Sequence, residues 1–523
     1  MKKQNSFFKA GALLALSGIL VKAFSAVYRI PLTRMLGADT MGRYSAVFSL
    51  FMPFFSFATA GIATSVAHFT AKFGADKAEA KNIIKNKAII IYMLISLLMA
   101  SVFILFSKFY SVLQKDNIFF YGSIILAPSL ALAALENVLK GASQGQMNML
   151  PTALANVIES LVKTTAGLLG VWCIMHFLPG NKDDAAVVVC LVAITAAGFV
   201  SALFLFVYCR KDKKTDRSNT DKTSITVKAA DMLKMSVPIS VSALTISLAG
   251  FFDTAVCLPR INAFSYGQIA NSFNSASFMG AGDMAMYLFG IWQGMVMSVF
   301  NLTPAVVSPV AAASLPLISK SWALRDKKSV SRQSTKLFCI TSFLSVPATM
   351  FVFCFGGDII QLLFDTTQHQ SVVAVSLLRI VCFGGIFCCF GSTLNTIMYA
   401  ADRSDKVFSI LLSACIVKSA VSWLLCGMPQ FNIKAFAVST VCFYTIIFMR
   451  SICEVKKLGV TLNLWDVFAI PALSALSSLF FVKWLFSSQL YSIPLFLRLI
   501  FAGVIFIFLY LLMIVSTGFL VDK

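Results

Sequence analysis

Some of the residues that could bind an anion lie inside an apolar segment near the start of the chain. Gly18, Lys22, Ser25 and Arg29 interrupt this segment, and their spacing of four, three and four positions places them on one side of a helix. A cation at the centre of a bilayer costs about 2.5–3.5 kcal/mol on insertion scales, so it seldom faces lipid. We therefore expect this helix to present a small, polar and positive face to a central cavity that receives an anionic ligand.

A later apolar segment, 150–178, repeats this pattern. Thr152, Asn156, Glu159 and Lys163 have the same spacing, and a Glu four residues ahead of a Lys is the favourable order for an ion pair within a helix. Two interpretations are open. The pair could be a neutralised structural pair that faces the bundle, or an anionic ligand could compete with Glu159 for Lys163.

Other charged residues in apolar segments are weaker candidates. Lys418 lies deep in its segment and is a further cavity cation, whereas Arg34 and Arg43 border a loop, where a structural role is as reasonable as a functional one. Asp253 and Glu136 could each take a coupling ion or a proton. Pairing of these carboxylates with a nearby Lys or Arg is the favoured interpretation, because buried charges are usually paired.

These residues belong to a chain with the composition of a membrane protein. Of its 523 residues, 58% are hydrophobic and 12% are charged, whereas a soluble protein carries about 25% charged residues. The sequence predicts an all-α polytopic membrane protein with fourteen transmembrane helices. The expected spans are 7–30, 43–69, 87–108, 119–140, 150–178, 185–208, 231–257, 284–318, 337–356, 372–399, 407–427, 432–451, 464–486 and 493–517.

The distribution of positive charge predicts the orientation. About two thirds of the 43 Lys and Arg fall in alternate connections between spans, as the positive-inside rule requires for a chain with both termini in the cytoplasm. The basic and apolar start of the chain is expected to be an uncleaved first span, because no small-residue cleavage site follows it.

The spans are expected to form two related lobes. Lys163 and Lys418 lie at corresponding places in the two halves. Because each half holds an even number of spans, the halves should be parallel repeats related by a pseudo-twofold axis along the membrane normal. The expected parts are an N-lobe of six helices (1–208), a basic cytoplasmic linker (209–230), a C-lobe of six helices (231–451) and a two-helix extension (452–523).

Several functions are excluded by pattern and position. The chain has no nucleotide-binding loop, nucleophile elbow or zinc motif, so we expect no enzyme and no cofactor. Thirteen Cys lie almost entirely in apolar runs and three His are far apart, so no metal site is expected. The net charge of +21 comes mainly from short connections, which favours contact with anionic membrane lipids and not with nucleic acid.

Two stretches resemble a known family. RIPLTRMLGADTMGRYS (29–45) and LKGASQGQMNMLPTALANVIESLVK (139–163) resemble the stage V sporulation protein B group of polysaccharide biosynthesis proteins. This group belongs to the multidrug/oligosaccharidyl-lipid/polysaccharide (MOP) flippase superfamily, beside the MurJ-type lipid II flippases. The resemblance covers the whole chain. It implies a flippase of the bacterial cytoplasmic membrane that moves an undecaprenyl-pyrophosphate-linked saccharide, such as a peptidoglycan precursor, by alternating access.

The resemblance also bears on individual residues. Lys22 matches a cavity position that Arg or Lys usually fills in the lipid II flippases. Those flippases carry further arginines where this chain has Ser56 and Met297, so the resemblance leaves the head group open. Because the sequence has no nucleotide-binding motif, we expect transport to be driven by membrane potential or an ion gradient, and the sequence does not choose between them.

Two alternative functions of the protein make different predictions. A cation-coupled multidrug antiporter of the same superfamily should have an acidic, aromatic cavity, whereas the expected cavity is basic. A non-transporting scaffold would recruit cell-wall synthesis enzymes through the basic linker, and neutralising the linker would abolish its role but spare a flippase. We expect a monomer whose main partner is the lipid-linked saccharide.

Overall fold

The protein is all-helical in the part that the structure describes. The computed structural model describes residues 2–74, 78–146, 148–177, 182–215, 228–264, 266–273, 283–460, 464–488 and 494–517, and these contain helices and connections but no strand. By its internal contacts the chain divides into two compact units, Met1–Pro259 and Arg260–Lys523.

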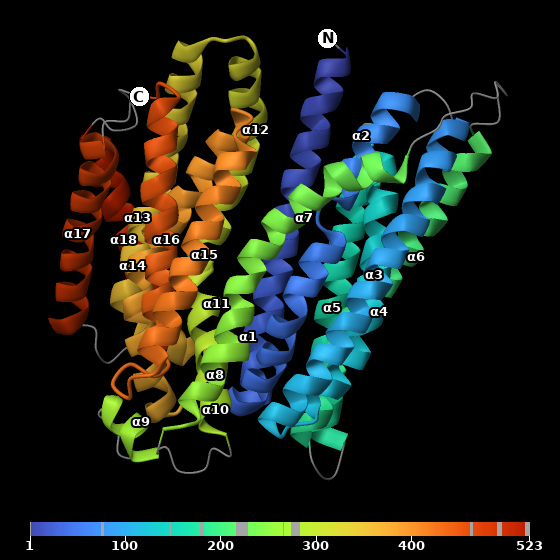
Figure 1. Ribbon diagram of the computed structural model, residues 1–523. Coiled ribbons are helices and arrows are strands. Elements are labelled where there is room, and N and C mark those ends of the chain that lie inside the picture. The colour runs from blue at the N-terminus through green and yellow to red at the C-terminus, as the bar shows by residue number, and fades with distance from the viewer. Residues whose placement is uncertain are drawn as a thin grey trace. The chain divides into compact units, whose positions relative to one another are not determined.

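In its described residues, the first unit consists mainly of seven long or medium helices and a π-helical turn (Figure 1). They are α1 (Lys2–Thr59), α2 (Ile62–Gly74), α3 (Ala78–Gln114), α4 (Ile118–Gln144), α5 (Leu150–Phe177), α6 (Lys182–Thr215) and α7 (Ala229–Phe252), followed by the π-helical turn η1 (Asp253–Cys257) and by α8 (Leu258–Ile261), which crosses into the second unit.

The second unit contains the remaining helices, and its long apolar segment near residue 300 is broken into several of them. They are α9 (Tyr266–Ser272), α10 (Met284–Gly290), the π-helical turn η2 (Ile291–Val296), α11 (Met297–Phe300), α12 (Leu302–Ala323), α13 (Lys327–Phe364), α14 (Gln368–Ala400), α15 (Ser404–Cys426), α16 (Lys434–Lys457), α17 (Leu464–Ser488) and α18 (Leu495–Ser516).

The number of membrane crossings agrees with the sequence. Thirteen described helical stretches are long and apolar enough to span a bilayer, and Met284–Phe300 is a shorter apolar helix. The first stretch, Leu16–Lys72, has 57 residues. It would measure about 85 Å if straight, more than twice the apolar thickness of a bilayer. The chain reverses within α1 (Figure 1), so this stretch makes two crossings and the described helices make fourteen in all. The predicted all-α polytopic fold is confirmed.

The reversal in α1 depends on Gly37. Its φ of 73° and ψ of 177° lie in a region that is essentially restricted to glycine, because a Cβ would clash with the residue's own backbone. Space is not the constraint, since a Cβ built at Gly37 would meet no atom within 4 Å.

Replacement of Gly37 by alanine is therefore expected to lower the stability of the protein by about 1–3 kcal/mol through backbone strain alone. The measurement is the thermal unfolding midpoint of the purified full chain. Gly18→Ala is the matched control, because a Cβ at Gly18 would also meet no atom within 4 Å but Gly18 has no positive φ. An equal midpoint for the two variants would contradict this role of Gly37.

Helix α7 packs with the first unit, although it follows the linker in sequence. It contacts α1, α2 and α3, and the Met232 carbonyl accepts hydrogen bonds from Ser65 Oγ (3.1 Å) and Tyr92 Oη (3.4 Å). These contacts place α7 in the first compact unit, which ends at Pro259. The division into repeat lobes at residues 208 and 209 concerns the internal repeat and stays a prediction. Residues 209–215 of the expected linker belong to α6, and most of the rest (216–227) lies outside the described residues.

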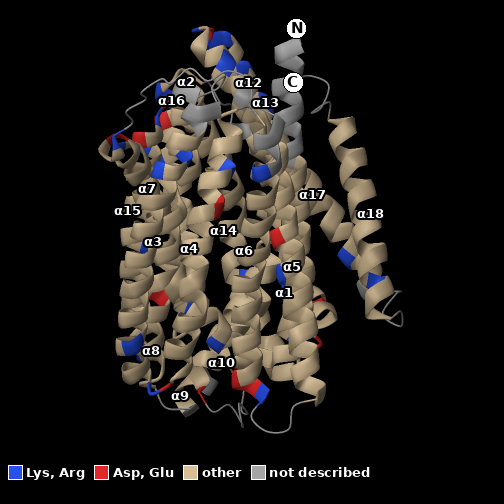
Figure 2. Cartoon of the chain, turned by 90° about the vertical axis from the view of Figure 1, so that its right-hand side faces the viewer, with Lys and Arg blue, Asp and Glu red and all other residues tan. Residues whose placement is uncertain are grey.

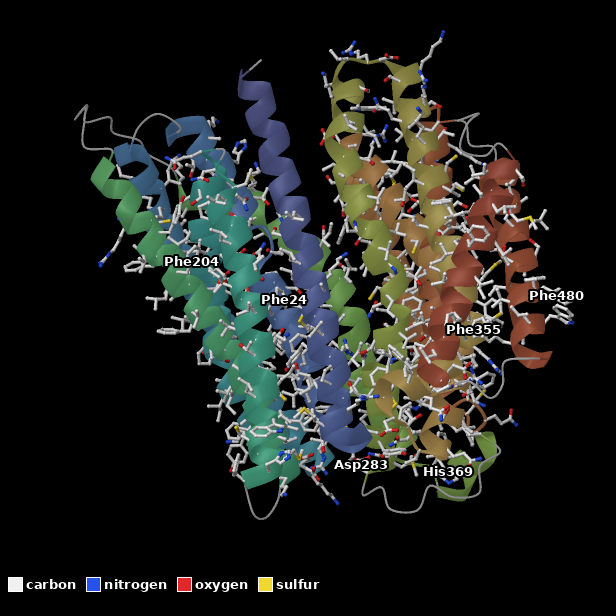
Figure 3. The ribbon with its side chains drawn as sticks, turned by 180° about the vertical axis from the view of Figure 1, so that it is seen from behind. Phe24, Phe204, Asp283, Phe355, His369 and Phe480 are labelled. Atoms are coloured by element: carbon white, nitrogen blue, oxygen red, sulfur yellow. The ribbon has the colours of Figure 1, made fainter. Side chains whose placement is uncertain are left out.

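The C-terminal helices of the second unit pack on α13. Helices α17 and α18 contact α13 and each other, and Arg498 on α18 forms an ion pair with Asp358 on α13 at 3.0 Å. Phe480 on α17 is 78% exposed and points away from the helices of its unit (Figure 3). A large exposed aromatic side chain is expected where a spanning helix faces lipid.

Charged residues gather toward the ends of the helices, and few lie along their middles (Figure 2). This pattern is typical of spanning helices, whose central turns lie in the apolar core of the bilayer. The few charged residues away from the ends therefore mark the part of the molecule where a function is expected.

Candidate functional site

Helices α1 and α5 approach each other closely. Ser160 Oγ and Thr164 Oγ1 on α5 lie 3.4 Å from backbone carbonyl oxygens of α1, those of Val21 and Phe24 respectively. Gly167, one turn further on, faces Tyr28, and a Cβ on this glycine would lie 2.6 Å from the Tyr28 ring. Small side chains on α5 thus let the two helices pack in register.

The predicted polar face of α1 points away from this helix contact. Lys22, Ser25 and Arg29 each follow directly after a residue that contacts α5, so these three are rotated by about 100° from the helix contact. Lys22 and Ser25 are exposed, and Arg29 is half-buried. Ser25 Oγ donates to the Val21 carbonyl at 2.8 Å. Lys22, Ser25 and Arg29 thus lie on one side of this helix, and the role of that side in binding an anion stays a prediction.

Lys163 extends from α5 toward α1. Its ammonium group lies 5.4 Å from the centre of the Tyr28 ring and 5.5 Å from that of Phe48. The same group interacts electrostatically with Glu159 and with Arg29. Arg29 and Lys163, two predicted cavity cations that are more than a hundred residues apart in sequence, thus lie close enough to interact electrostatically.

A buried ion pair connects α4 with α5 and α6. Glu136 and Lys140 are 3% and 8% exposed, and Lys140 Nζ lies 2.5 Å from Glu136 Oε1. Lys140 Nζ also donates to Asn156 Oδ1 at 2.7 Å, and Ser201 Oγ on α6 donates to Glu136 Oε1 at 2.6 Å. Buried charges persist only with such partners, so these contacts account for the burial of the pair.

Glu159 joins this ion pair to Lys163. Its carboxylate interacts electrostatically with Glu136, Lys140 and Lys163. Further along the same face of α5, Thr152 Oγ1 accepts a hydrogen bond from Gln144 Nε2 at 3.3 Å. These polar groups along one face of α5 are together called the polar seam. It comprises Gln144, Thr152, Lys140, Asn156, Glu136, Ser201, Glu159, Lys163 and Arg29.

The seam contains residues that were not predicted from the sequence. Lys140 follows Glu136 by four positions in α4, so the rule for ion pairs within a helix could have found it. Nothing in the local sequence indicates Ser201, because it reaches Glu136 from another helix. Pairing of Glu136 with a nearby lysine is the interpretation that the sequence favoured. Asp253, the other candidate for ion coupling, is buried at the start of η1.

The remaining predicted cations occupy different surroundings. Arg43 forms ion pairs with Asp184 (3.1 Å), Asp39 (3.8 Å) and Asp116 (4.0 Å). These partners lie on α1 itself, before α4 and at the start of α6, so Arg43 ties together three parts of the first unit. Arg34 is exposed. The structural interpretation thus describes Arg43 better than a role in binding.

Lys418 lies in the second unit, buried in α15. One turn further along that helix, Ser422 and Ser439 share a hydrogen bond of 2.7 Å that joins α15 to α16. Lys418 is thus a buried cation within a spanning helix of the second unit, as the sequence predicts.

The chain is similar to several known proteins. The family model described as polysaccharide biosynthesis protein matches residues 7–322, and the MatE model matches residues 293–424. Stage V sporulation protein B of Bacillus subtilis (strain 168) is 22% identical over 471 residues, which are 87% of this chain and 85% of that protein. Lipid II flippase MurJ of the same organism is 24% identical over 362 residues, 66% of this chain and 63% of that protein.

A solved structure shows the same fold. It is the inward-facing conformation of a multidrug resistance MATE family transporter of the MOP superfamily, with a TM-score of 0.62 and 14% identity, covering 87% of this chain and 99% of the other. At this identity the likeness concerns the fold alone. Because the first family model covers more than half of the residues, the chain belongs to the polysaccharide biosynthesis protein family of the MOP flippase superfamily.

Proposed function

We propose that this protein is a flippase that moves an undecaprenyl-pyrophosphate-linked saccharide across the bacterial cytoplasmic membrane. The observation that carries the proposal is the proximity of Arg29 and Lys163 in the first unit, beside the exposed Lys22 and Ser25. The family membership supports the class of substrate. Its finer identity, lipid II or a related polysaccharide unit, belongs to the proposal.

The charge of the seam suits an anionic head group. The seam has three cations, Arg29, Lys140 and Lys163, and two carboxylates, Glu136 and Glu159. Its net charge is therefore +1 before Lys22 is counted. A pyrophosphate loses most of its hydration in a low-dielectric cavity, so it needs cations that compensate for this loss. Guanidinium and ammonium groups placed side by side can contact several phosphate oxygens at once.

Glu159 interacts with both Lys140 and Lys163, and this suggests how the substrate is bound and released. A bound pyrophosphate would attract the Lys163 ammonium away from Glu159, while Lys140 remains beside both carboxylates to compensate for their charge. When the head group leaves, the Glu159–Lys163 contact forms again. Part of the binding free energy is thus used to break the Glu159–Lys163 contact. This keeps the affinity for the head group moderate and permits its release on the other side of the membrane.

Other predicted residues keep separate roles within the proposal. Lys418 is a candidate cation of the second unit and is tested by its own substitution. Asp253 is kept as a candidate for a coupling ion within the proposal, and Glu136 is hydrogen-bonded by Ser201 and paired with Lys140. We also propose that both termini lie in the cytoplasm, which the distribution of positive charge supports.

The test is a transport assay with the full chain in proteoliposomes. Labelled lipid II, a second polyprenyl-pyrophosphate saccharide and a cationic dye are compared side by side, with and without a membrane potential. We expect movement of at least one pyrophosphate-linked lipid and no uptake of the dye. Uptake of the dye under a cation gradient, without lipid movement, would instead support the multidrug antiporter.

A further inference from the structure

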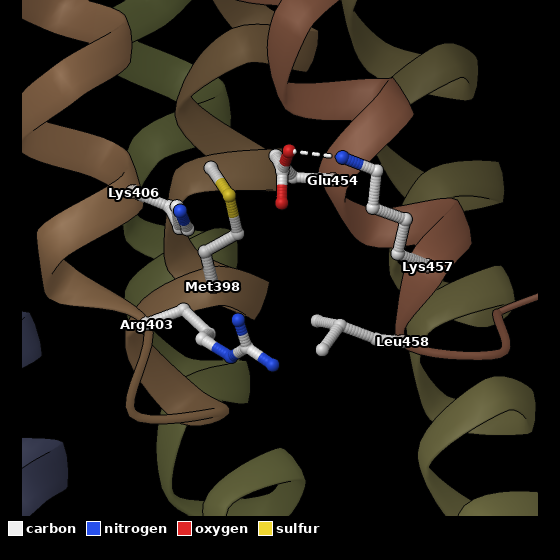
Figure 4. A pocket seen from close by; sticks show the side chains of 6 residues that line it. All are labelled: Met398, Arg403, Lys406, Glu454, Lys457 and Leu458. Atoms are coloured by element: carbon white, nitrogen blue, oxygen red, sulfur yellow. Dashed lines mark hydrogen bonds and ion pairs between the residues drawn. The ribbon is translucent and has the colours of Figure 1, made fainter.

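A basic pocket lies in the second unit, where the ends of three spanning helices meet (Figure 4). Its wall includes the end of α14, the connection to α15, the first turn of α15 and the last turn of α16. The side chains that line it are Met398, Arg403, Lys406, Glu454, Lys457 and Leu458.

The pocket has an excess of positive charge. Glu454 Oε1 lies 2.6 Å from Lys457 Nζ, and the same carboxylate also interacts electrostatically with Lys406 and Arg403. Three cations thus surround one carboxylate. The Lys457 side chain is 70% exposed and that of Glu454 only 24%, so the carboxylate forms the base of the pocket and the cations its rim.

The backbone and the neighbouring helices hold this arrangement in place. Asp402 has a φ of 56°, which allows a short turn in which the Arg403 amide donates to the Met398 carbonyl at 2.9 Å. Arg450 on α16 donates to the Ser409 carbonyl on α15 at 3.4 Å. The pocket is therefore part of the packed helix ends and not of a long loop.

The position of the pocket identifies the kind of ligand. It lies at the junction of α14 with α15 and at the end of α16, where spanning helices leave the membrane. The segments 400–406 and 450–463 both belong to the connections that the charge distribution places on the cytoplasmic side. A rim of Arg and Lys at this level, beside the apolar Met398 and Leu458, matches a phosphate group that is attached to an apolar body.

We propose that this pocket binds the phosphate of an anionic phospholipid head group. The cations contact the phosphate oxygens, Met398 and Leu458 contact the apolar part of the lipid, and Glu454 orients Lys457. This site is separate from the polar seam and does not depend on the proposed transport activity.

The test measures lipid retention by native mass spectrometry on the full chain after purification from membranes that contain phosphatidylglycerol. The double variant Arg403→Gln/Lys406→Gln is expected to retain less phosphatidylglycerol, with a loss of about fivefold in affinity for each removed cation. Glu454→Gln should retain more, because it removes the only carboxylate among the residues that line the described pocket.

The matched control is Lys327→Gln/Lys328→Gln. These two lysines are exposed at the start of α13, in another connection expected on the cytoplasmic side, and they do not line the pocket. An equal loss in both double variants would overturn the proposal, because it would indicate a general effect of surface charge. Unchanged retention in the pocket variant would overturn it as well.

A second measurement distinguishes the lipid from free phosphate. The thermal unfolding midpoints of the parental chain and of the pocket variant Arg403→Gln/Lys406→Gln are both measured. Each is compared in phosphatidylglycerol nanodiscs, in phosphatidylcholine nanodiscs and in phosphatidylcholine nanodiscs with inorganic phosphate. We expect stabilisation by phosphatidylglycerol that is absent from the pocket variant. Stabilisation by inorganic phosphate alone would overturn a lipid ligand in favour of a soluble phosphate.

Discussion

Replacement of Lys140 by methionine is expected to destabilise the protein by about 3–5 kcal/mol, the usual cost of removing one partner from a buried ion pair. Methionine fills a similar volume, so little of this loss would come from an empty cavity. The loss arises because Glu136, which is 3% exposed, would keep its hydrogen bond from Ser201 but lose the ammonium group at 2.5 Å. The Asn156 side chain would also lose its donor. The measurement is the thermal unfolding midpoint of the purified full chain.

The double variant Glu136→Gln/Lys140→Met provides the decisive comparison. A neutral glutamine can still accept the hydrogen bond from Ser201, and no uncompensated charge is left, so most of the stability should return. Lys108→Met serves as the control, because Lys108 is exposed on α3. If the loss of stability in the double variant equals the sum of the losses in Glu136→Gln and Lys140→Met, the two groups do not act as a pair.

Replacement of Lys163 by methionine is expected to slow transport of a pyrophosphate-linked saccharide by about tenfold or more. A hydrogen bond to a charged group contributes about 1.5–3 kcal/mol, and this contact would be lost whenever the head group occupies the seam. Methionine retains the apolar contact with the rings of Tyr28 and Phe48. The folding of the variant should therefore be affected much less than its activity. The rate is measured with labelled lipid in proteoliposomes.

Two further variants show whether this effect is specific. Lys22→Ala should also slow transport, since Lys22 lies on the exposed polar face of α1. Lys108→Met removes a cation elsewhere in the first unit and should leave the rate unchanged. A parental rate in Lys163→Met, with a normal amount of protein in the membrane, would show that the seam does not bind the head group.

The sequence by itself determined the class of protein, the number of crossings and the polar faces of two helices. These properties depend on local periodicity: an apolar run of sufficient length spans a bilayer, and a spacing of three or four residues defines one side of a helix. For this reason the face that contains Asn156, Glu159 and Lys163 was predictable, as was the face that contains Lys22 and Arg29. The Glu136–Lys140 pair could have been predicted from the same helical spacing.

Only the tertiary structure decided which helices meet and which charges are shared. The contacts of Lys140 with Asn156, of Ser201 with Glu136 and of Lys163 with the field of Arg29 join different helices, and no local pattern specifies them. Likewise, the carboxylates around Arg43 come from three separate parts of the chain. Burial makes an unpaired charge costly, so the partner that packing places nearby decides whether a cation is structural or available to a ligand.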